Sequence, residues 1–156
     1  MSEIPMRAFA QSLPMALMRA RESVMRVFRP VLASHGLSEQ QWRVLRALAS
    51  AEDGLAVGEL ADRTFLLGPS LSRILANLER RRLVDRTIVS DDLRRSRITI
   101  SAVGLELVRA VAPESEAHYA RIEASFGPQR MAGLYELLED LAILGTDTAS
   151  ETRRTR

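Results

Sequence analysis

The sequence contains no cysteine and no lysine, and only two of its 156 residues are histidines. Without cysteine the chain cannot form disulfide scaffolds or thiolate metal sites, and it cannot sense oxidants through a thiol. His35 and His118 lie far apart in the chain, and no metal-ligand spacing is visible around them. We therefore expect neither a metal nor a cofactor.

Long apolar runs and aromatic residues are also scarce. No run of about 18 apolar residues is present, so no transmembrane helix is expected. The N-terminus lacks the regions of a signal peptide, which predicts a cytoplasmic protein. Aromatic residues make up 4% of the chain and hydrophobic residues 46%, which favours helix-on-helix packing. No Ser/His/Asp arrangement, glycine-rich phosphate loop or spaced carboxylate pair indicates an enzyme.

Charge is distributed unevenly along the chain. All 22 basic residues are arginine, and the formal net charge is only +2. Residues 63–97 carry nine arginines against four acidic residues, a net charge of +5, whereas residues 101–150 carry three against eight, a net charge of −5. A basic middle beside an acidic end indicates a polyanionic partner for the middle alone.

Helical periodicity dominates both ends of the sequence. Apolar residues recur at steps of three or four over 12–34, 102–125 and 128–145, which predicts three long helices. The first should end at His35 and Gly36, because glycine suits the left-handed position after a helix. Residues 147–156 are polar, and we expect them to be disordered.

Shorter elements are predicted in the middle. Ser38 and Gln41 form a capping box at the start of a second helix, a third helix is expected over 57–64, and Pro69 opens a fourth over 69–81. Residues 55–57 form either a short strand or the lead into the third helix. Apolar and polar residues then alternate over 84–88 and 97–100 around a polar loop, which predicts a β-hairpin.

This order predicts a mainly α protein, a winged helix-turn-helix with a two-stranded β wing and N- and C-terminal dimerisation helices. Residues 37–101 would be the DNA-binding domain, and residues 1–36 and 102–146 the dimerisation helices of a single compact chain. The terminal helices carry more apolar surface than a small wing domain covers. A twofold homodimer would cover it and meet half-sites about 34 Å apart on a pseudo-palindromic operator; an intramolecular helical hairpin is the alternative.

The fourth helix and the hairpin loop are the candidate contacts to double-stranded DNA. The second helix of such a pair fits the major groove, with hydrogen-bonding groups at its N-terminal end. Arg73 is the candidate for a base contact, because its guanidinium fork matches guanine O6 and N7. A thin basic loop can enter the minor groove, and Asp92 can orient Arg94. The residues assigned to DNA are Pro69, Ser70, Ser72, Arg73, Asn77, Asp92, Arg94, Arg95 and Arg97.

Arg21 is the candidate for binding a small ligand. It lies in a stripe of Met18, Met25 and Phe28, and an arginine among apolar neighbours needs an anionic partner. A carboxylate effector would supply one; an intersubunit salt bridge is the alternative. Trp42 also suits plain core, and His35 a cation at a helix C-terminus. The ligand-binding candidates are Met18, Arg21, Met25, His35, Trp42 and Arg43.

Several motifs carry a family resemblance over residues 10–145. Residues 60–61, 69–73, 78–80 and 83–86 resemble the helix-turn-helix of the multiple-antibiotic-resistance regulator (MarR) family, and residues 92–95 with 98–101 and Gly104 resemble its wing. Residues 17–22, 28–30 and 35–43 resemble the subgroup that controls homoprotocatechuate (4-hydroxyphenylacetate) degradation operons. The resemblance implies a homodimeric repressor of an aromatic catabolic operon, released by a small aromatic acid.

One residue departs from the family pattern, and other functions stay open. Arg82 stands where the family usually has glycine, and a left-handed backbone there would cost about 1–2 kcal/mol; either the helix ends differently or the strain is tolerated. A protein-interaction module without DNA, an architectural DNA binder without a ligand, and a regulator with a non-aromatic effector are the alternatives.

Overall fold

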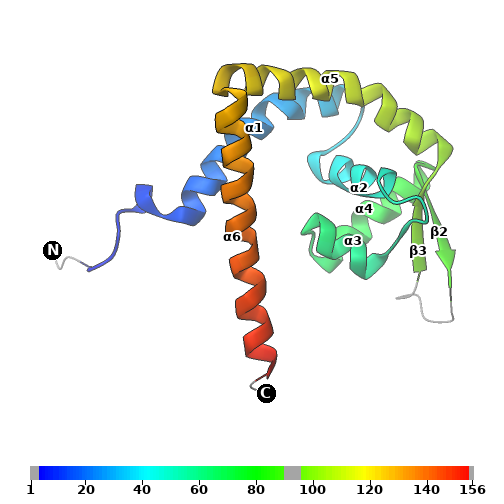
Figure 1. Ribbon diagram of the computed structural model, residues 1–156. Coiled ribbons are helices and arrows are strands. Elements are labelled where there is room, and N and C mark those ends of the chain that lie inside the picture. The colour runs from blue at the N-terminus through cyan, green and yellow to red at the C-terminus, as the bar shows by residue number, and fades with distance from the viewer. Residues whose placement is uncertain (1–3, 90–95, 155–156) are drawn as a thin grey trace. The chain divides into compact units, whose positions relative to one another are not determined.

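The computed structural model describes residues 4–89 and 96–154, with side chains as far as residue 145. The chain divides into two compact units, residues 1–115 and 116–156, whereas a single compact chain was expected. Figure 1 shows the elements. They are η1 (Phe9–Gln11), α1 (Leu13–Ser34), α2 (Glu39–Ala49), β1 (Leu55–Ala56), α3 (Val57–Thr64), α4 (Gly68–Arg80), β2 (Val84–Ile88), β3 (Ser96–Ile100), α5 (Ala102–Phe126) and α6 (Pro128–Arg154).

Helix α1 buries only its C-terminal part. Phe28 and Leu32 are buried, whereas Leu13 and Leu17 remain 48% and 41% exposed. The helix continues through Pro30 to Ser34. It ends where expected, because Gly36 takes a left-handed conformation with φ +69°.

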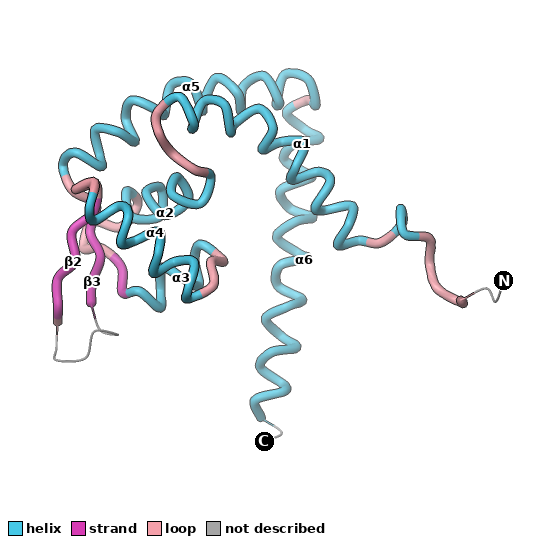
Figure 2. The backbone as a smooth tube through the Cα atoms, turned by 180° about the vertical axis from the view of Figure 1, so that it is seen from behind, coloured by secondary structure: helices cyan, strands magenta, loops and turns pink. Residues whose placement is uncertain are grey.

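The first unit has a core built from α2, α3 and α4. Each of these helices turns one leucine-rich face inward, as the helical spacing predicts. Helix α5 covers this core with Val111, and β3 closes it with Ile98. Figure 2 shows the three short helices beside the strands. The fully buried leucines are Leu45 and Leu48 of α2, Leu60 of α3, and Leu71, Leu75 and Leu78 of α4, with Leu32 from α1.

The sheet has three antiparallel strands in the order β1-β3-β2. β2 and β3 form the predicted hairpin, with Arg86 opposite Ile98 and Ile88 opposite Ser96. β1 adds a third strand through the pairing of Leu55 with Ile98. The two-stranded wing is confirmed, and of the two alternatives left open for residues 55–57 the structure has the short strand at Leu55 and Ala56. Gly54 allows this pairing, since a Cβ there would lie 2.3 Å from the Ile98 carbonyl oxygen.

Helix α4 ends in a Schellman motif. The Leu83 amide donates to the Leu78 carbonyl at 2.9 Å, and the Arg82 amide donates to Glu79 at 2.9 Å. Arg82 is left-handed with φ 58°, so the helix ends as in the family pattern and the strain of about 1–2 kcal/mol is tolerated. The Ser101 hydroxyl donates to the Arg82 carbonyl at 2.7 Å and ties this turn to the start of α5.

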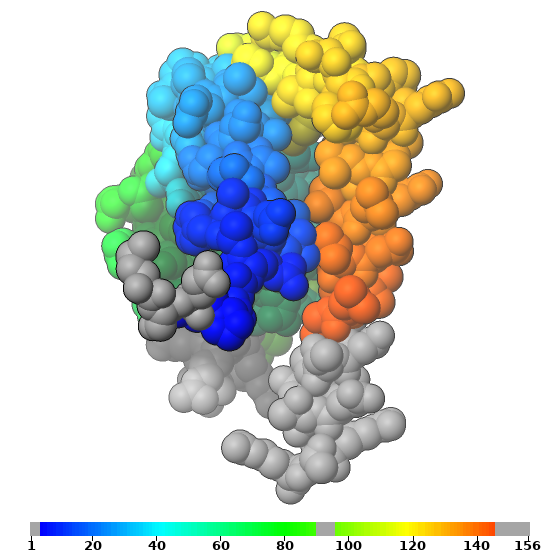
Figure 3. Space-filling view, turned by 90° about the vertical axis from the view of Figure 1, so that its left-hand side faces the viewer, coloured from blue at the N-terminus to red at the C-terminus, as the bar shows by residue number. Residues whose placement is uncertain are grey.

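The second unit contains α6, which extends further than expected. The helix continues to Arg154, and disorder from residue 147 stays a prediction. No proline or glycine follows Gly145 to end it. The apolar stripe of α6 stays exposed in the single chain, and Figure 3 shows this helix in orange at the surface. Its exposed apolar residues are Leu134, Tyr135, Leu137, Leu138, Leu141, Ile143 and Leu144. None of the helices in the described ranges has the length and apolarity that crossing a membrane requires.

Candidate nucleic-acid interface and effector site

The N-terminal half of α4 presents a polar face. Leu71, Leu75 and Leu78 are fully buried, and this turns Ser70, Ser72 and Arg73 to the surface, where all three are exposed. The sequence-based assignment of these three to one exposed face is confirmed by the geometry. Whether they contact DNA is a proposal that is taken up below.

Pro69 and Asn77 fit the assigned face less well. The helix begins at Gly68 rather than Pro69, so Pro69 occupies its second position, where its missing N–H costs no hydrogen bond. Asn77 is half-buried, and its Oδ1 accepts from Gln41 Nε2 at 3.0 Å. Gln41 also completes the predicted capping box with Ser38. Asn77 therefore joins α4 to the start of α2, a role that the polar-face pattern did not reveal.

An ion pair links α4 to the wing. Arg86 on β2 donates from Nε and Nη2 to the Glu79 carboxylate at 3.1 and 3.3 Å, and from Nη1 to Ser96 Oγ at 2.8 Å. The two charged side chains are 27% and 30% exposed. Arg86 thus joins β2 and β3 to α4. The net charge of +5 already includes Glu79, and the structure shows that Arg86 is the arginine that this carboxylate pairs with.

The remaining wing residues separate into two groups. Arg97 lies on β3, where its Nε donates to the Asp53 carbonyl at 2.6 Å and holds the turn before β1. Asp92, Arg94 and Arg95 lie outside the described residues. Their assignment to the minor groove stays a prediction.

The turn between α3 and α4 places two apolar side chains in water. Phe65 is 90% exposed and Leu67 is 78% exposed. Phe65 is left-handed, with φ 54°, and Leu67 is the N-cap residue of α4 with no side-chain cap. The sequence analysis treated this segment as a connector. One signal in the sequence could have revealed this exposed apolar pair. Leucine stands directly before Gly68-Pro69, at the position where Ser, Thr, Asp or Asn usually caps a helix.

The effector candidates on α1 and α2 meet at a carboxylate. Arg21 contacts Glu39 and lies 3.5 Å from Glu22, and its side chain is 45% exposed. Arg43 donates to Glu39 Oε1 at 3.0 Å and to the Thr64 carbonyl at 2.9 Å. The premise that Arg21 is buried without an anion is therefore wrong for the single chain, because Glu39, on the next helix, supplies one.

Three members of this cluster were missed. Arg29 donates to Glu39 Oε2 at 3.0 Å and makes two bonds of 2.8 Å to the Glu22 carboxylate. These bonds hold the pKa of Glu22 below its usual value, and they raise the pKa of Arg29. The spacing of these residues in the sequence could have indicated the cluster. Glu22 and Arg29 share a helix face at i and i+7, and Glu39 and Arg43 are spaced i and i+4. With three arginines and two glutamates, the cluster has one excess positive charge.

The other ligand candidates do not join this cluster in the single chain. His35 Nε2 pairs with Glu114 Oε1 at 3.0 Å and ties α1 to α5. Trp42 is 9% exposed and belongs to the hydrophobic core, which was the alternative to a ligand-binding role. Met18 is exposed and Met25 is half-buried on α1. Only Arg21 and Arg43 are brought together.

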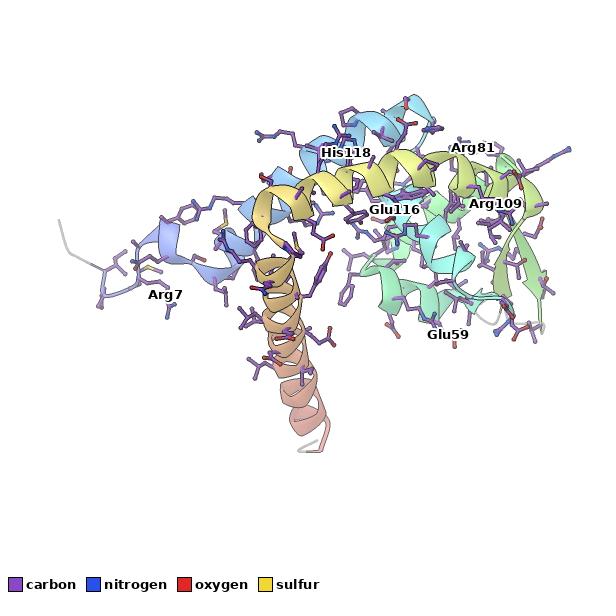
Figure 4. All side chains as sticks on the ribbon, turned by 45° about the horizontal axis from the view of Figure 1, so that its top comes forward. Arg7, Glu59, Arg81, Arg109, Glu116 and His118 are labelled. Carbon is purple, nitrogen blue, oxygen red and sulfur yellow. The ribbon has the colours of Figure 1, made fainter. Side chains whose placement is uncertain are left out.

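Two further hydrogen bonds connect ends of elements in the first unit. Arg81, at the end of α4, donates from Nη1 to the Gly36 carbonyl at 3.0 Å. Glu59 on α3 accepts from the Ala56 amide at 2.8 Å. Figure 4 labels both residues, which lie on different elements of the first unit. They position the ends of α1, α3 and α4.

Paired helices α3 and α4 followed by a hairpin wing define a winged helix-turn-helix protein, a class that binds DNA. Comparison with known proteins identifies the particular family. A model described as "MarR family" matches residues 35–95, and the chain is 40% identical over 134 residues to the homoprotocatechuate degradative operon repressor of Escherichia coli, covering 86% of this chain and 90% of the relative. The chain belongs to the MarR family, whose members are transcription regulators and not enzymes.

Two further relatives agree with this assignment. The HTH-type transcriptional regulator FarR of Neisseria gonorrhoeae is 36% identical over 140 residues, covering 89% of this chain and 94% of the relative. The structure of NadR in complex with 4-hydroxyphenylacetate superposes with a TM-score of 0.78 at 34% identity, covering 86% of this chain and 98% of that one. The mainly helical winged fold predicted from the sequence is confirmed.

Proposed function

We propose that this protein is a homodimeric repressor that binds a pseudo-palindromic operator of an aromatic-acid catabolic operon and is released by a small aromatic carboxylate. The observation that carries the proposal is the exposed polar face at the start of α4, held beside the wing by the pair of Glu79 and Arg86. The relatives named as repressor and regulator support the same conclusion.

DNA contact is assigned to the start of α4 and to the wing. Arg73 is exposed in the first half of α4, where its two terminal nitrogens can bind guanine O6 and N7. Ser70 and Ser72 can bind bases or phosphates beside the N-terminus of the helix. Arg94 and Arg95 of the hairpin loop would reach the minor groove, and Asp92 would orient them.

Dimerisation is assigned to the apolar faces of α1 and α6. Val24 and Val27 of α1 are 40% and 41% exposed, and Leu137 and Leu144 of α6 are each 64% exposed. Apolar rows of this length in water indicate an interface. A twofold axis would then place two copies of α4 against half-sites about one helical turn apart.

The effector is assigned to the arginine cluster on α1 and α2. One excess positive charge among Arg21, Arg29 and Arg43 matches a single carboxylate, which guanidinium groups bind in a bidentate manner. Arg21 and Arg43 stay the primary candidates, with Met18 and Met25 on α1 as apolar neighbours for an aromatic ring. NadR, a relative of 34% identity, has been solved with 4-hydroxyphenylacetate, which makes this acid the first probe.

The proposal is tested by fluorescence anisotropy with the DNA upstream of the protein's own gene and a scrambled duplex of equal length. Arg73→Ala should weaken specific binding, since one bidentate base contact is worth about 1–3 kcal/mol. Arg109→Ala is the control, because Arg109 is exposed on α5 and pairs with Glu106 of the same helix. Equal affinity of the wild type for the upstream duplex and the scrambled duplex would refute the repressor assignment.

The effector arm uses Arg21→Gln. This variant should keep operator affinity but need a higher 4-hydroxyphenylacetate concentration for release, because it removes the most exposed guanidinium of the cluster. A variant that responds to the acid as the wild type does would remove Arg21 from the effector site. A wild type that binds the operator but ignores aromatic and non-aromatic acids alike would leave a regulator without this class of ligand.

A further inference from the structure

The turn between α3 and α4 breaks two rules of local structure within three residues. Phe65 adopts a left-handed backbone, with φ 54°, at a helix end where glycine or asparagine is usual. Leu67 is the N-cap of α4, yet a leucine side chain cannot accept from the free amides of the first turn. Both choices weaken the local fold, and departures of this kind concentrate at functional sites.

The stability lost through these two departures is not regained by packing of the two side chains within the first unit. Phe65 is 90% and Leu67 78% exposed, so neither side chain fills the core. Their neighbours face inward, because Thr64 is buried and its hydroxyl donates to the Leu60 carbonyl at 2.6 Å, and Leu66 packs against the core. Arg43 also donates to the Thr64 carbonyl at 2.9 Å. The turn is therefore anchored and holds two large apolar groups in water.

The position of the turn indicates what these groups contact. Leu67 precedes Gly68, the first residue of α4, and Ser70, Ser72 and Arg73 follow on the exposed face assigned to DNA. Among the base pairs, only those with thymine offer an apolar group in the major groove, the 5-methyl of the base. An apolar pair beside the polar face of a recognition helix matches that edge.

We propose that Leu67, together with Phe65, forms an apolar contact with thymine 5-methyl groups of the operator and selects thymine at the bases next to those that Arg73 binds. This inference rests on the proposed function, because it needs the start of α4 to lie in the major groove. It adds a specificity determinant that hydrogen bonding from Ser70, Ser72 and Arg73 does not provide.

The experiment compares two forms of one operator duplex. One form is made by PCR with dTTP and the other with dUTP, so that they differ only in the thymine methyl groups. Affinity is measured by anisotropy for the wild type, Leu67→Ser, Phe65→Asn and Val103→Ser. Val103, on α5, is 59% exposed and serves as the matched loss of an exposed apolar side chain. Thermal denaturation of each protein without DNA is recorded in parallel.

We expect the wild type to bind uracil DNA about fourfold more weakly for each methyl group that it buries. Leu67→Ser and Phe65→Asn should bind thymine DNA more weakly than the wild type does and should lose the difference between the two duplexes. Both should also melt at a higher temperature, because serine restores a helix cap and asparagine tolerates the left-handed backbone. Val103→Ser should keep the full difference.

Other outcomes overturn the inference. Equal wild-type affinity for the two duplexes, with specific binding intact, would remove the methyl contact and leave the repressor assignment standing. A difference that persists in both turn variants would place methyl recognition elsewhere. Lower melting temperatures for both variants would mean that the two side chains stabilise the protein itself. Failure of the wild type to bind the thymine duplex specifically would instead refute the proposed function.

Discussion

Replacing Glu79 with glutamine tests whether the wing is positioned by its ion pair with Arg86. Removal of a negative charge from a DNA-binding surface should tighten binding if only the electrostatic field mattered. The structure predicts the opposite, because Glu79 accepts two bonds from Arg86, at 3.1 and 3.3 Å, and Arg86 also holds Ser96 on β3. Glutamine has a similar volume but accepts only one of these bonds, without charge.

The expected size follows from burial. Charge-assisted hydrogen bonds contribute about 1.5–3 kcal/mol when they are buried, and the side chains of Glu79 and Arg86 are 30% and 27% exposed. With solvent screening, the loss of unfolding free energy should be about 1–2 kcal/mol. If a misplaced wing costs binding a similar amount, operator affinity falls by roughly 5- to 30-fold.

Anisotropy titrations at several salt concentrations, with thermal denaturation in parallel, measure both effects. Asp85→Asn is the matched control, because Asp85 neighbours Arg86 on β2, is exposed, and undergoes the same change of charge. This control should bind DNA equally well or more tightly. If Glu79→Gln binds more tightly than the wild type, then Arg86 acts as a free DNA contact and the positioning role is refuted.

Three further substitutions test the fold and the charge cluster. Arg82→Gly should raise the unfolding free energy by about 0.5–1 kcal/mol, because it relieves a left-handed residue at φ 58°; a lower Tm would contradict this. Gly104→Ala should cost about 2–4 kcal/mol, since its Cβ would lie 2.1 Å from the Leu83 carbonyl oxygen, whereas Gly58→Ala meets nothing within 4 Å; equal Tm values would refute the clash. Glu22→Gln should lower Tm at neutral pH, because Arg29 holds the pKa of Glu22 below its usual value of 4.5. A carboxyl group with a lowered pKa stabilises the fold at a pH above its ordinary pKa, and this stabilisation is lost as the pH falls through the lowered pKa. The Tm values of the wild type and Glu22→Gln should therefore become equal in acid. A Tm difference that persists at the lowest pH would mean that the difference does not come from the charge of Glu22.

Features with a local cause could be predicted from the sequence. The capping box of Ser38 and Gln41 and the left-handed Gly36 depend on residues within a few positions of each other, and both appear as expected. The buried face of α4 follows from the spacing of its leucines. These local signals explain why the order of elements, and with it the winged fold, was predicted.

Contacts between elements distant in the chain could not be predicted in the same way. Arg86 counted as one of nine basic residues, and only the fold shows that Glu79 neutralises it. Arg21 was assigned an outside anion, but α2 brings Glu39 to it. In both cases the pattern indicated a charged residue, and its partner depended on how separate elements pack together, which sequence spacing does not encode. The sequence left a strand at residues 55–57 as one of two alternatives, because its pairing with β3 far along the chain is not encoded locally.

The most direct test of the account is the affinity of the wild-type protein for its own upstream DNA with and without 4-hydroxyphenylacetate, titrated at several salt concentrations. The account predicts specific binding whose log K falls linearly with log salt concentration, by about 0.9 for each neutralised phosphate. It also predicts that the acid weakens this binding, whereas a neutral aromatic alcohol does not. Affinity equal to that for scrambled DNA, or binding that no aromatic acid weakens, would contradict the claim of a ligand-released repressor.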